Sequence, residues 1–225
     1  MHIDPHKKVF IINELGDRTL RSLLKQESIS WQIKVNILKG VSNGLAHLHS
    51  CDPCILHLDL KSENVLLFGH SAKNSVPKLC DFGLAVEMRP GLEYIMFGNG
   101  TIQYMAPEVI RDDDIELSKG FDEGADVYSF SMIMWEVAHN DGRLPWEGEV
   151  FEQDIIEGEL GLDQSTLIQN AVLQNKRPKV TCEIPLEYNR IMEACWQQDS
   201  YDRPRFSSSR SSRHPQLIST LLSQL

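Results

Sequence analysis

The chain has 225 residues, a formal net charge of −10 and a hydrophobic fraction of 41%. Its length suits one well-packed domain, and its acidic balance argues against a nucleic-acid-binding protein, which needs a basic face. The N-terminal residues MHIDPHKK lack the apolar core of a signal peptide, and no apolar run in the sequence approaches the roughly 18 residues of a membrane span.

The first part of the chain predicts a strand followed by two helices. Residues 9–12, Val-Phe-Ile-Ile, form the short β-branched run that is typical of a buried strand. Thr19 can cap a short helix that extends over 19–25. A longer helix begins at Ser30, because apolar residues then recur on one face at three- and four-residue steps, and it ends shortly before Pro53.

A strand pair and a long loop follow. Residues 65–68 and 76–80 are apolar runs separated by a polar segment, which predicts two paired strands. Residues 81–104 contain several glycines and a proline and predict a long loop. Loops of this length are usually functional.

The C-terminal half predicts mainly helices. Residues 125–138 are apolar on nearly all sides and carry few charges, which indicates a helix buried all round. Further helices are expected at 165–173, 186–196 and 215–222. The expected fold class is therefore α+β, mostly α, in one domain without internal repeats.

Two polar stretches depart from this pattern. Residues 147–163 contain seven acidic residues and no Lys or Arg. A solvated acidic loop is the plainer interpretation, and a docking surface for a basic partner is the alternative. Residues 207–212 form a Ser/Arg-rich run that we expect to be a flexible connection.

Three motifs occur in order along the chain: HLDLKSEN at 57–64, DFG at 81–83 and APE at 106–108. This set resembles the signature of the eukaryotic protein kinases. The resemblance implies a kinase-like C-terminal lobe, preceded by the last strand of the N-terminal lobe and the hinge. It also implies a transferase that moves the γ-phosphate of ATP to protein serine or threonine with the help of Mg²⁺.

The resemblance assigns the catalytic chemistry to a few residues. Asp59 aligns with the carboxylate that accepts or orients the proton of the substrate hydroxyl, and Lys61 aligns with the lysine that steadies the transferring phosphate. Asn64 and Asp81 align with the two Mg²⁺-binding positions, and both offer the hard oxygen ligands that this ion requires. Thr101 aligns with a hydroxyl that hydrogen-bonds near the catalytic Asp and Lys in serine/threonine kinases.

The nucleotide contacts are assigned by a shorter match. Residues 11–16, IINELG, resemble the strand and hinge that meet the adenine ring. By this resemblance the backbone around Glu14 and Gly16 would face the adenine edge, and Leu66 would lie beneath the ring. Lys61 would contact the nucleotide at its phosphate end.

Further matches imply structural roles. Glu108 is expected to form a buried ion pair with Arg203, and the loss of either partner should be strongly destabilising. Asp126 matches a buried helix residue that holds the backbone of the catalytic loop. His57 and Phe82 are expected to pack in a hydrophobic spine.

Three positions refine the resemblance. A lysine at Lys61 favours serine/threonine over tyrosine specificity. The Cys195-Trp196 pair resembles the tyrosine-kinase-like group, of the mixed-lineage and receptor-interacting kinase type. Leu58 stands where most kinases carry an arginine that pairs with a phosphorylated activation loop, so activity should depend less on loop phosphorylation through this contact.

The ATP-covering part of the family pattern has no match, because no G-x-G-x-x-G motif, strand lysine or helix glutamate precedes Val9. We expect one incomplete kinase domain over 1–225. The end of the N-terminal lobe would span 1–13, the hinge and C-terminal lobe 14–206, and a Ser-rich connection with a terminal helix 207–225. The isolated chain should then be an inefficient kinase that needs the missing lobe or a covering partner over its apolar face.

Two functional hypotheses remain open, besides a degraded product without a stable fold. The first is the catalytic lobe of a serine/threonine kinase whose N-terminal lobe is encoded upstream. The second is a non-catalytic, pseudokinase-like scaffold or partner-docking module. The presence of Asp59, Lys61, Asn64 and Asp81 favours the first, since a scaffold needs none of them.

The cysteines indicate the compartment. There are five, an odd number scattered along the chain, which fits a reducing interior and a cytoplasmic location. Cys51 and Cys54 have the spacing of a metal or redox motif. A closed zinc site needs four ligands, so two free thiols are the preferred interpretation.

Overall fold

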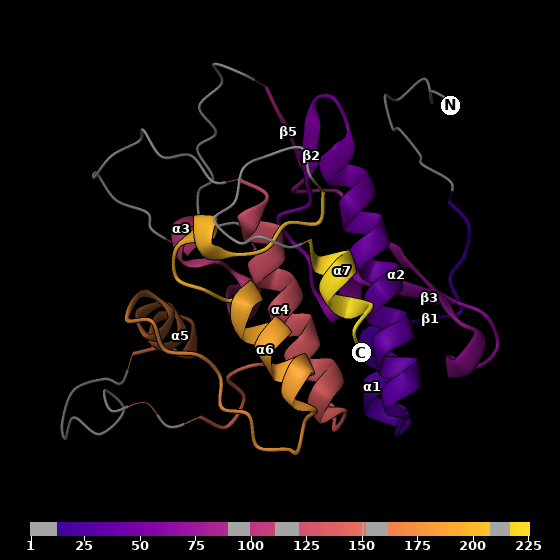
Figure 1. The fold of residues 1–225 in the computed structure, drawn as a ribbon. Coiled ribbons are helices and arrows are strands. Elements are labelled where there is room, and N and C mark those ends of the chain that lie inside the picture. The colour runs from indigo at the N-terminus through magenta and orange to yellow at the C-terminus, as the bar shows by residue number, and fades with distance from the viewer. Residues whose placement is uncertain (1–12, 90–99, 111–121, 150, 152–161, 208–216) are drawn as a thin grey trace, which may run out of the picture.

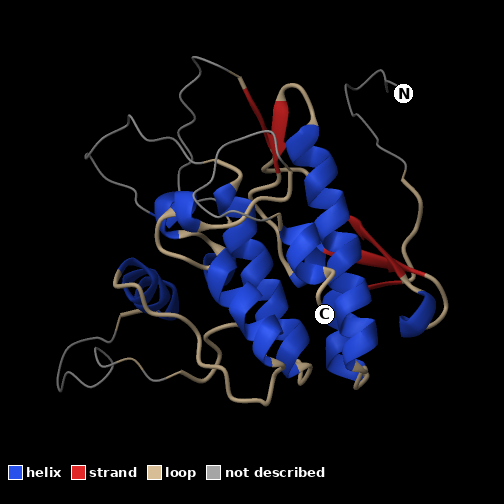
Figure 2. Cartoon of the chain, in the orientation of Figure 1, coloured by secondary structure: helices blue, strands red, loops and turns tan. Residues whose placement is uncertain are grey.

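The computed structural model describes residues 13–89, 100–110, 122–149, 151, 162–207 and 217–225. In this part of the chain, helices make up the body of the molecule and short strands lie at two of its edges (Figures 1 and 2). The helices are α1 (Leu20–Gln26), α2 (Trp31–Ser50), α3 (Pro107–Ile110), α4 (Gly124–His139), α5 (Gln164–Leu173), α6 (Leu186–Cys195) and α7 (Ile218–Leu222).

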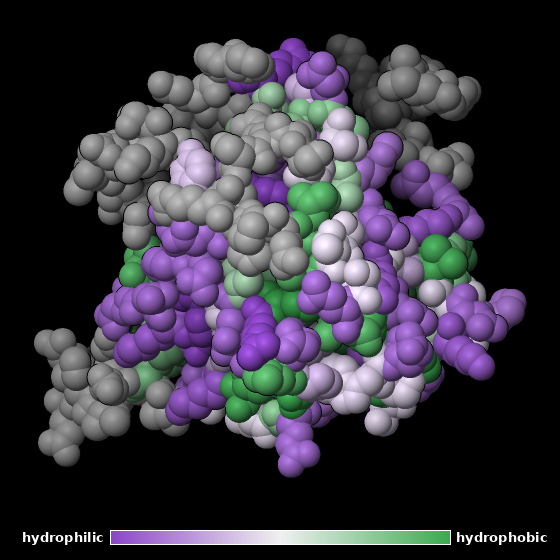
Figure 3. Space-filling view, in the orientation of Figure 1, coloured by the Kyte–Doolittle hydropathy of each residue, from purple (hydrophilic) through white to green (hydrophobic). Residues whose placement is uncertain are grey.

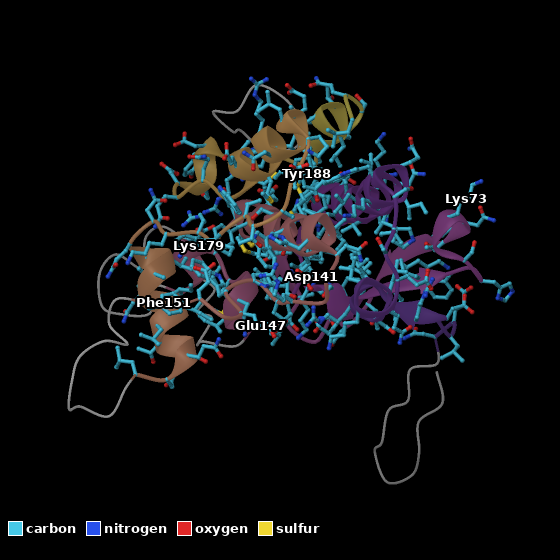
Figure 4. The ribbon with its side chains drawn as sticks, turned by 90° about the horizontal axis from the view of Figure 1, so that it is seen from below. Lys73, Asp141, Glu147, Phe151, Lys179 and Tyr188 are labelled. Atoms are coloured by element: carbon cyan, nitrogen blue, oxygen red, sulfur yellow. The ribbon has the colours of Figure 1, made fainter. Side chains whose placement is uncertain are left out.

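α4 is the centre of this body. Every residue from Gly124 to Ala138 is buried, as the apolar sequence predicted. α2 and α6 pack against it, α7 packs on α2 and α6, and Figure 1 shows α4 between α2 and α6. Across this packing the Tyr188 hydroxyl donates a hydrogen bond to the Met134 carbonyl (2.6 Å), and the Tyr188 ring meets Trp31 edge-on. Figure 4 shows Tyr188 on α6, turned toward the other helices.

The strands form two small antiparallel sheets. One has the order β1-β3-β4, from β1 (Arg18–Thr19), β3 (Val65–Phe68) and β4 (Val76–Leu79). The other pairs β2 (Cys54–Leu56) with β5 (Val86–Met88) at one end of α2. β4 packs closely on α2, because a Cβ on Gly40 would lie only 2.3 Å from Pro77 Cγ.

Most of the predicted elements are confirmed. The short helix is capped as expected, with the Thr19 hydroxyl accepting from the Ser22 amide (3.1 Å), and the strand pair at 65–80 is present with Val65 opposite Leu79. The long helix follows Ser30, although the Ser30 side chain makes no capping hydrogen bond. The remaining predicted helices correspond to α4, α5, α6 and α7.

The prediction of a continuous loop over 81–104 is wrong in one part. β5 lies inside this segment and pairs with β2, which was also not predicted. Both strands are only three residues long, so neither has the run of alternating residues that marks a strand in a sequence. The predicted strand at 9–12 lies outside the described residues, and so do residues 150 and 152–161 of the acidic stretch and residues 208–212 of the Ser/Arg-rich run.

The exposed surface in the orientation of Figure 3 is mainly hydrophilic, with small apolar patches between the polar side chains. Within the described ranges no helix is both long enough and apolar enough to cross a membrane. All five cysteines are free thiols.

One ion pair fastens α3 to the C-terminal part of the chain. Arg203 is fully buried and donates from two nitrogens to the Glu108 carboxylate, at 2.6 and 2.8 Å. The same guanidinium donates to the carbonyls of Gln197 and Gly124 (2.8 and 2.7 Å) and lies over the Tyr128 ring. The predicted pair is therefore confirmed, with backbone acceptors that satisfy the rest of the buried guanidinium.

This geometry predicts a large effect of Glu108→Ala. The substitution leaves the Arg203 charge buried without a counter-charge, so the free energy of unfolding should fall by about 3 kcal/mol. Urea unfolding followed by circular dichroism measures this change. The control is Glu187→Ala, which breaks an exposed pair with Arg190 and should cost less than about 0.5 kcal/mol. Equal losses in the two variants would contradict the assigned role of the buried pair.

Candidate active site

The backbone of the segment around Asp59 is held by one buried carboxylate. Asp126 on α4 accepts from the amides of His57 (2.8 Å) and Leu58 (2.9 Å) and from the His49 ring (2.9 Å). Leu58 has a φ of +61°, in the left-handed region that costs a residue with a side chain about 1 kcal/mol. The carboxylate stabilises this unusual conformation, and so the direction in which the next residue, Asp59, leaves the loop.

The electrostatics of Asp126 agree with this role. Burial alone would raise the pKa of the carboxyl group, but the hydrogen bonds from His49, His57 and Leu58 outweigh burial, so its pKa lies below the ordinary value. The group is therefore ionised in the folded protein at neutral pH. The sequence-based prediction for Asp126 is confirmed by the three hydrogen bonds.

Asp59, Lys61 and Thr101 form a closed triangle of hydrogen bonds. The Lys61 ammonium donates to Asp59 Oδ2 (2.8 Å) and to Thr101 Oγ1 (2.9 Å), and the Thr101 hydroxyl donates to Asp59 Oδ1 (3.0 Å). The side chains of Asp59 and Lys61 keep 11% and 22% of their surface exposed. A carboxylate, an ammonium and a hydroxyl thus converge at a site that solvent, and hence a substrate, can reach.

Asn64 contacts this triangle through Asp59. Its side-chain amide donates to the Asp59 carbonyl (2.8 Å) and to Asp59 Oδ2 (3.1 Å). The short 3-10 helix Ser62–Asn64 sets this geometry, since it begins directly after Lys61 and the Asn64 amide donates to the Lys61 carbonyl (2.9 Å). Four of the predicted residues are therefore in contact.

Asp81 is brought next to this group by the backbone. The Cys80 amide donates to the Asn64 carbonyl (3.0 Å), which extends the β3–β4 ladder by one step toward the site. The His57 ring hydrogen-bonds the Cys80 carbonyl (3.0 Å) and packs on Phe82, with ring centroids 5.1 Å apart. Asp81 itself is exposed and has a φ of +61°.

The oxygens of Asn64 and Asp81 fit a magnesium ion. Both are hard ligands, and Mg²⁺ is usually held by one or two protein side chains together with phosphate oxygens and water. Among the residues that the structure describes, there is no cluster of three or more His, Cys, Asp or Glu that would hold a metal by itself. The donor set thus suits an ion that arrives with its phosphates.

The three predicted adenine contacts are neighbours at the β1-β3-β4 sheet, with Leu66 in β3 and Glu14 and Gly16 in the segment before β1. Gly16 is in contact with Leu66, because a Cβ on Gly16 would lie 3.1 Å from Leu66 Cβ. The Glu14 carboxylate pairs with Lys78, and Lys78 stands opposite Leu66 in the β3–β4 register. These residues are therefore neighbours of one another. Leu66 and Asn64 are joined through Val65, the first residue of β3.

A second buried cluster was missed by sequence reasoning. Glu136 on α4 accepts from the hydroxyls of Tyr104 (2.6 Å) and Ser62 (2.8 Å) and from the Arg21 guanidinium (3.2 Å). Burial raises the pKa of Glu136 from its ordinary value of 4.5 to about 7. The available signal was a glutamate within an apolar helix, since a buried charge normally has partners.

Comparison with known proteins finds a matching family model and several relatives. The family model of the protein kinase domain matches residues 2–215. A Dictyostelium discoideum protein named probable serine/threonine-protein kinase roco7 is 32% identical over 182 residues, which are 81% of this chain and 6% of that protein. Another, named probable serine/threonine-protein kinase pats1, is 33% identical over 181 residues, which are 79% of this chain and 5% of that protein.

A third relative from the same organism, named probable serine/threonine-protein kinase drkC, is 29% identical over 208 residues, which are 90% of this chain and 24% of that protein. The chain thus spans less than a tenth of the length of the first two relatives and about a quarter of the third.

The role of Asp126 is tested by Asp126→Asn, which keeps the size of the side chain but removes its charge and turns one acceptor into a donor. At least one of the three donors then loses its partner in a buried site, so the free energy of unfolding should fall by about 2–4 kcal/mol. Chemical denaturation at pH 7 gives this value. Asp141→Asn, an exposed pair with Arg143, should change it by less than about 1 kcal/mol. A similarly small loss for Asp126→Asn would show that the segment around Asp59 keeps its conformation without this carboxylate, which would contradict the assigned role.

Glu136 predicts a pH dependence of stability. Its pKa is raised on folding, so its contribution to stability is fully present below pH 4.5 and is lost as the pH rises through about 7. The change should be on the order of 3 kcal/mol. Denaturation midpoints of the wild type and Glu136→Gln between pH 5 and pH 8 measure it. The variant should have the flatter profile, and parallel profiles would assign the effect to another group.

Proposed function

This chain belongs to the protein kinase domain family and is homologous to serine/threonine protein kinases, and on that premise we propose that it transfers the γ-phosphate of ATP to protein serine or threonine. The observation that carries the proposal is the Asp59–Lys61–Thr101 triangle. Phosphoryl transfer needs a correctly oriented substrate hydroxyl and positive charge near the phosphate more than it needs covalent chemistry. In the triangle, the Asp59 carboxylate can orient that hydroxyl and the Lys61 ammonium supplies the charge.

Within this proposal each corner of the triangle has its own role. Asp59 accepts or orients the proton of the substrate hydroxyl. Lys61 places its ammonium against the negative charge of the transferring phosphate. Thr101 accepts a hydrogen bond from Lys61 and donates one to Asp59, so it holds the two charged groups in register.

The nucleotide and metal roles are assigned to neighbouring residues. Asn64 and Asp81 would hold Mg²⁺, which screens the phosphate charge when it is bound with ATP. The backbone at Glu14 and Gly16 would face the adenine edge, with Leu66 against the ring. Support comes from the contact of Gly16 with Leu66 and from the continuity of Leu66 with Asn64 along the chain.

Finer assignments belong to the same proposal. We place the chain in the tyrosine-kinase-like group on the strength of Cys195-Trp196. Residues 1–13 are proposed as the end of the N-terminal lobe, 14–206 as the hinge and C-terminal lobe, and 207–225 as the connection and terminal helix. Five free cysteines support a reducing, cytoplasmic location.

Regulation through the activation loop should differ from that of kinases with an arginine before the catalytic aspartate. Leu58 occupies that position and is buried, with its amide on Asp126. It offers no charge for a phosphorylated residue to pair with. We propose that loop phosphorylation is not read through this position.

A second candidate function is a non-catalytic docking module. It is favoured by exposed apolar groups beside the proposed nucleotide site, where Leu15 is 92% exposed and Phe82 is 47% exposed. A partner that covered Leu15 and Phe82 would remove this apolar surface from water. The two functions differ in whether the chain binds Mg²⁺ and ATP.

The test compares nucleotide binding with phosphate transfer. Isothermal titration with ATP and Mg²⁺ measures the first, and transfer of labelled γ-phosphate to a pool of serine- and threonine-containing peptides measures the second. Asp81→Asn should weaken Mg²⁺-dependent ATP binding at least about tenfold. Asp59→Asn should leave binding intact and lower transfer by about 10²–10⁴-fold.

Asp141→Asn is the control, because this exposed residue pairs with Arg143 and lies outside the proposed site. It should match the wild type in both measurements. Binding and transfer by the isolated chain should both be weak, as expected of an inefficient kinase, but they should still respond to Asp81→Asn and Asp59→Asn. A folded wild-type chain with no measurable Mg²⁺-dependent ATP binding even at millimolar ATP would contradict the catalytic proposal and favour the docking module.

A further inference from the structure

The cluster around Glu136 joins three segments that are far apart in the sequence. Its carboxylate, with 1% of the side-chain surface exposed, contacts Arg21 of α1, Ser62 of the segment after Lys61, and Tyr104 of the segment after Thr101. A single buried acceptor with partners on three segments fixes their relative positions, because each would lose a hydrogen bond to a charged group on moving away.

Two of these segments carry the corners of the triangle. Ser62 directly follows Lys61 and opens the 3-10 helix that ends at Asn64. Tyr104 ends a turn that begins at Thr101, and its backbone amide donates to the Thr101 carbonyl (2.8 Å). The Glu136 carboxylate therefore binds one residue on each side of the Lys61–Thr101 contact: Ser62, next to Lys61, and Tyr104, in the turn that follows Thr101.

The base of this arrangement is rigid. Glu136 and Asp126 both belong to α4, the buried central helix, and Ser129 of the same helix donates from its hydroxyl to the Tyr104 carbonyl (2.8 Å). Arg21 is also held by Glu63 and by the Arg143 carbonyl (3.2 Å). The charged and titratable groups that face Glu136 are thus Arg21 from α1, Glu63 beside Ser62, and Tyr104.

We propose that Glu136 is a positioning residue for phosphoryl transfer, which sets the distance between the Lys61 and Thr101 segments through the hydroxyls of Ser62 and Tyr104. Asp126 fixes the backbone just before Asp59 through the amides of His57 and Leu58. Glu136 fixes the segments that carry Lys61 and Thr101, the two residues that contact Asp59. The inference rests on the proposed function for the meaning of the triangle, but the geometric coupling is independent of it.

The pKa of Glu136 gives the coupling a distinctive signature. Because burial raises this pKa to about 7, the carboxyl group changes charge in the neutral range. The hydrogen bonds from Ser62 and Tyr104 should be stronger when the group is ionised. The positions of the two segments should therefore respond to pH with a midpoint near 7.

Amide hydrogen exchange and proton–nitrogen NMR of the whole chain test this coupling. The reporters are the amides of Asn64 and Tyr104, which donate to Lys61 and Thr101, and the reference is the amide of Cys51 at the end of α2. Ser62→Ala should speed exchange of the Asn64 amide by about tenfold relative to the Cys51 amide. Tyr104→Phe should speed exchange of the backbone amide at position 104 by a similar factor.

The two signals should also titrate with a midpoint near pH 7 in the wild type, and this titration should vanish in Glu136→Gln. Glu193→Gln, an exposed glutamate of α6, is the matched control and should leave both the rates and the titration unchanged. Neither readout needs nucleotide or turnover, so failure of the positioning role is distinguishable from failure of the proposed kinase activity.

Two results would overturn the proposal. One is exchange at the reporter amides that rises only in step with Cys51, which indicates a loss of overall stability and no local positioning. The other is a titration that persists in Glu136→Gln and so belongs to another group. Ser62→Ala and Tyr104→Phe each remove only a hydroxyl, so the test remains available if Glu136→Gln does not fold.

Discussion

The site depends on the carboxylate of Asp126. It is fully buried in α4, and it accepts hydrogen bonds from two consecutive amides of the catalytic segment and from His49. Without an ionised acceptor at this position, the left-handed conformation of Leu58 would have no compensation and two buried amides would lose their partner. The direction of Asp59, and so its meeting with Lys61 and Thr101, follows from this constraint.

α4 therefore serves as a platform as well as the centre of the core. Its apolar surface packs against α2 and α6. Three of its polar residues form hydrogen bonds to the loops that carry the site. Asp126 fixes the entry to the catalytic segment, Ser129 holds the Tyr104 carbonyl, and Glu136 joins the Ser62 and Tyr104 hydroxyls. Rigid support of this kind is what a preorganised site requires, because its groups must be in place before the substrate arrives.

How much of this the sequence predicts differs from residue to residue. α4 and α2 were predictable because their apolar patterns are long, and Asp126, Glu108 and Arg203 were found because they lie in recognisable motifs. β2 and β5 were not predicted, since each has three residues and exists only through pairing across a long stretch of chain. The role of Glu136 was also missed, because it depends on three partners that only the folded chain brings together.

The most direct test of the account is where a divalent ion binds when it is supplied with a nucleotide. Mn²⁺ can replace Mg²⁺ at oxygen ligands and broadens the NMR signals of nearby residues. Titrated with a non-hydrolysable ATP analogue, it should first broaden the signals of Asn64 and Asp81, then those of Asp59 and Lys61, and leave Leu221 on α7 sharp. Broadening that is centred on other residues, or equal broadening of all these signals, would contradict a catalytic site at Asp59, Lys61, Asn64 and Asp81.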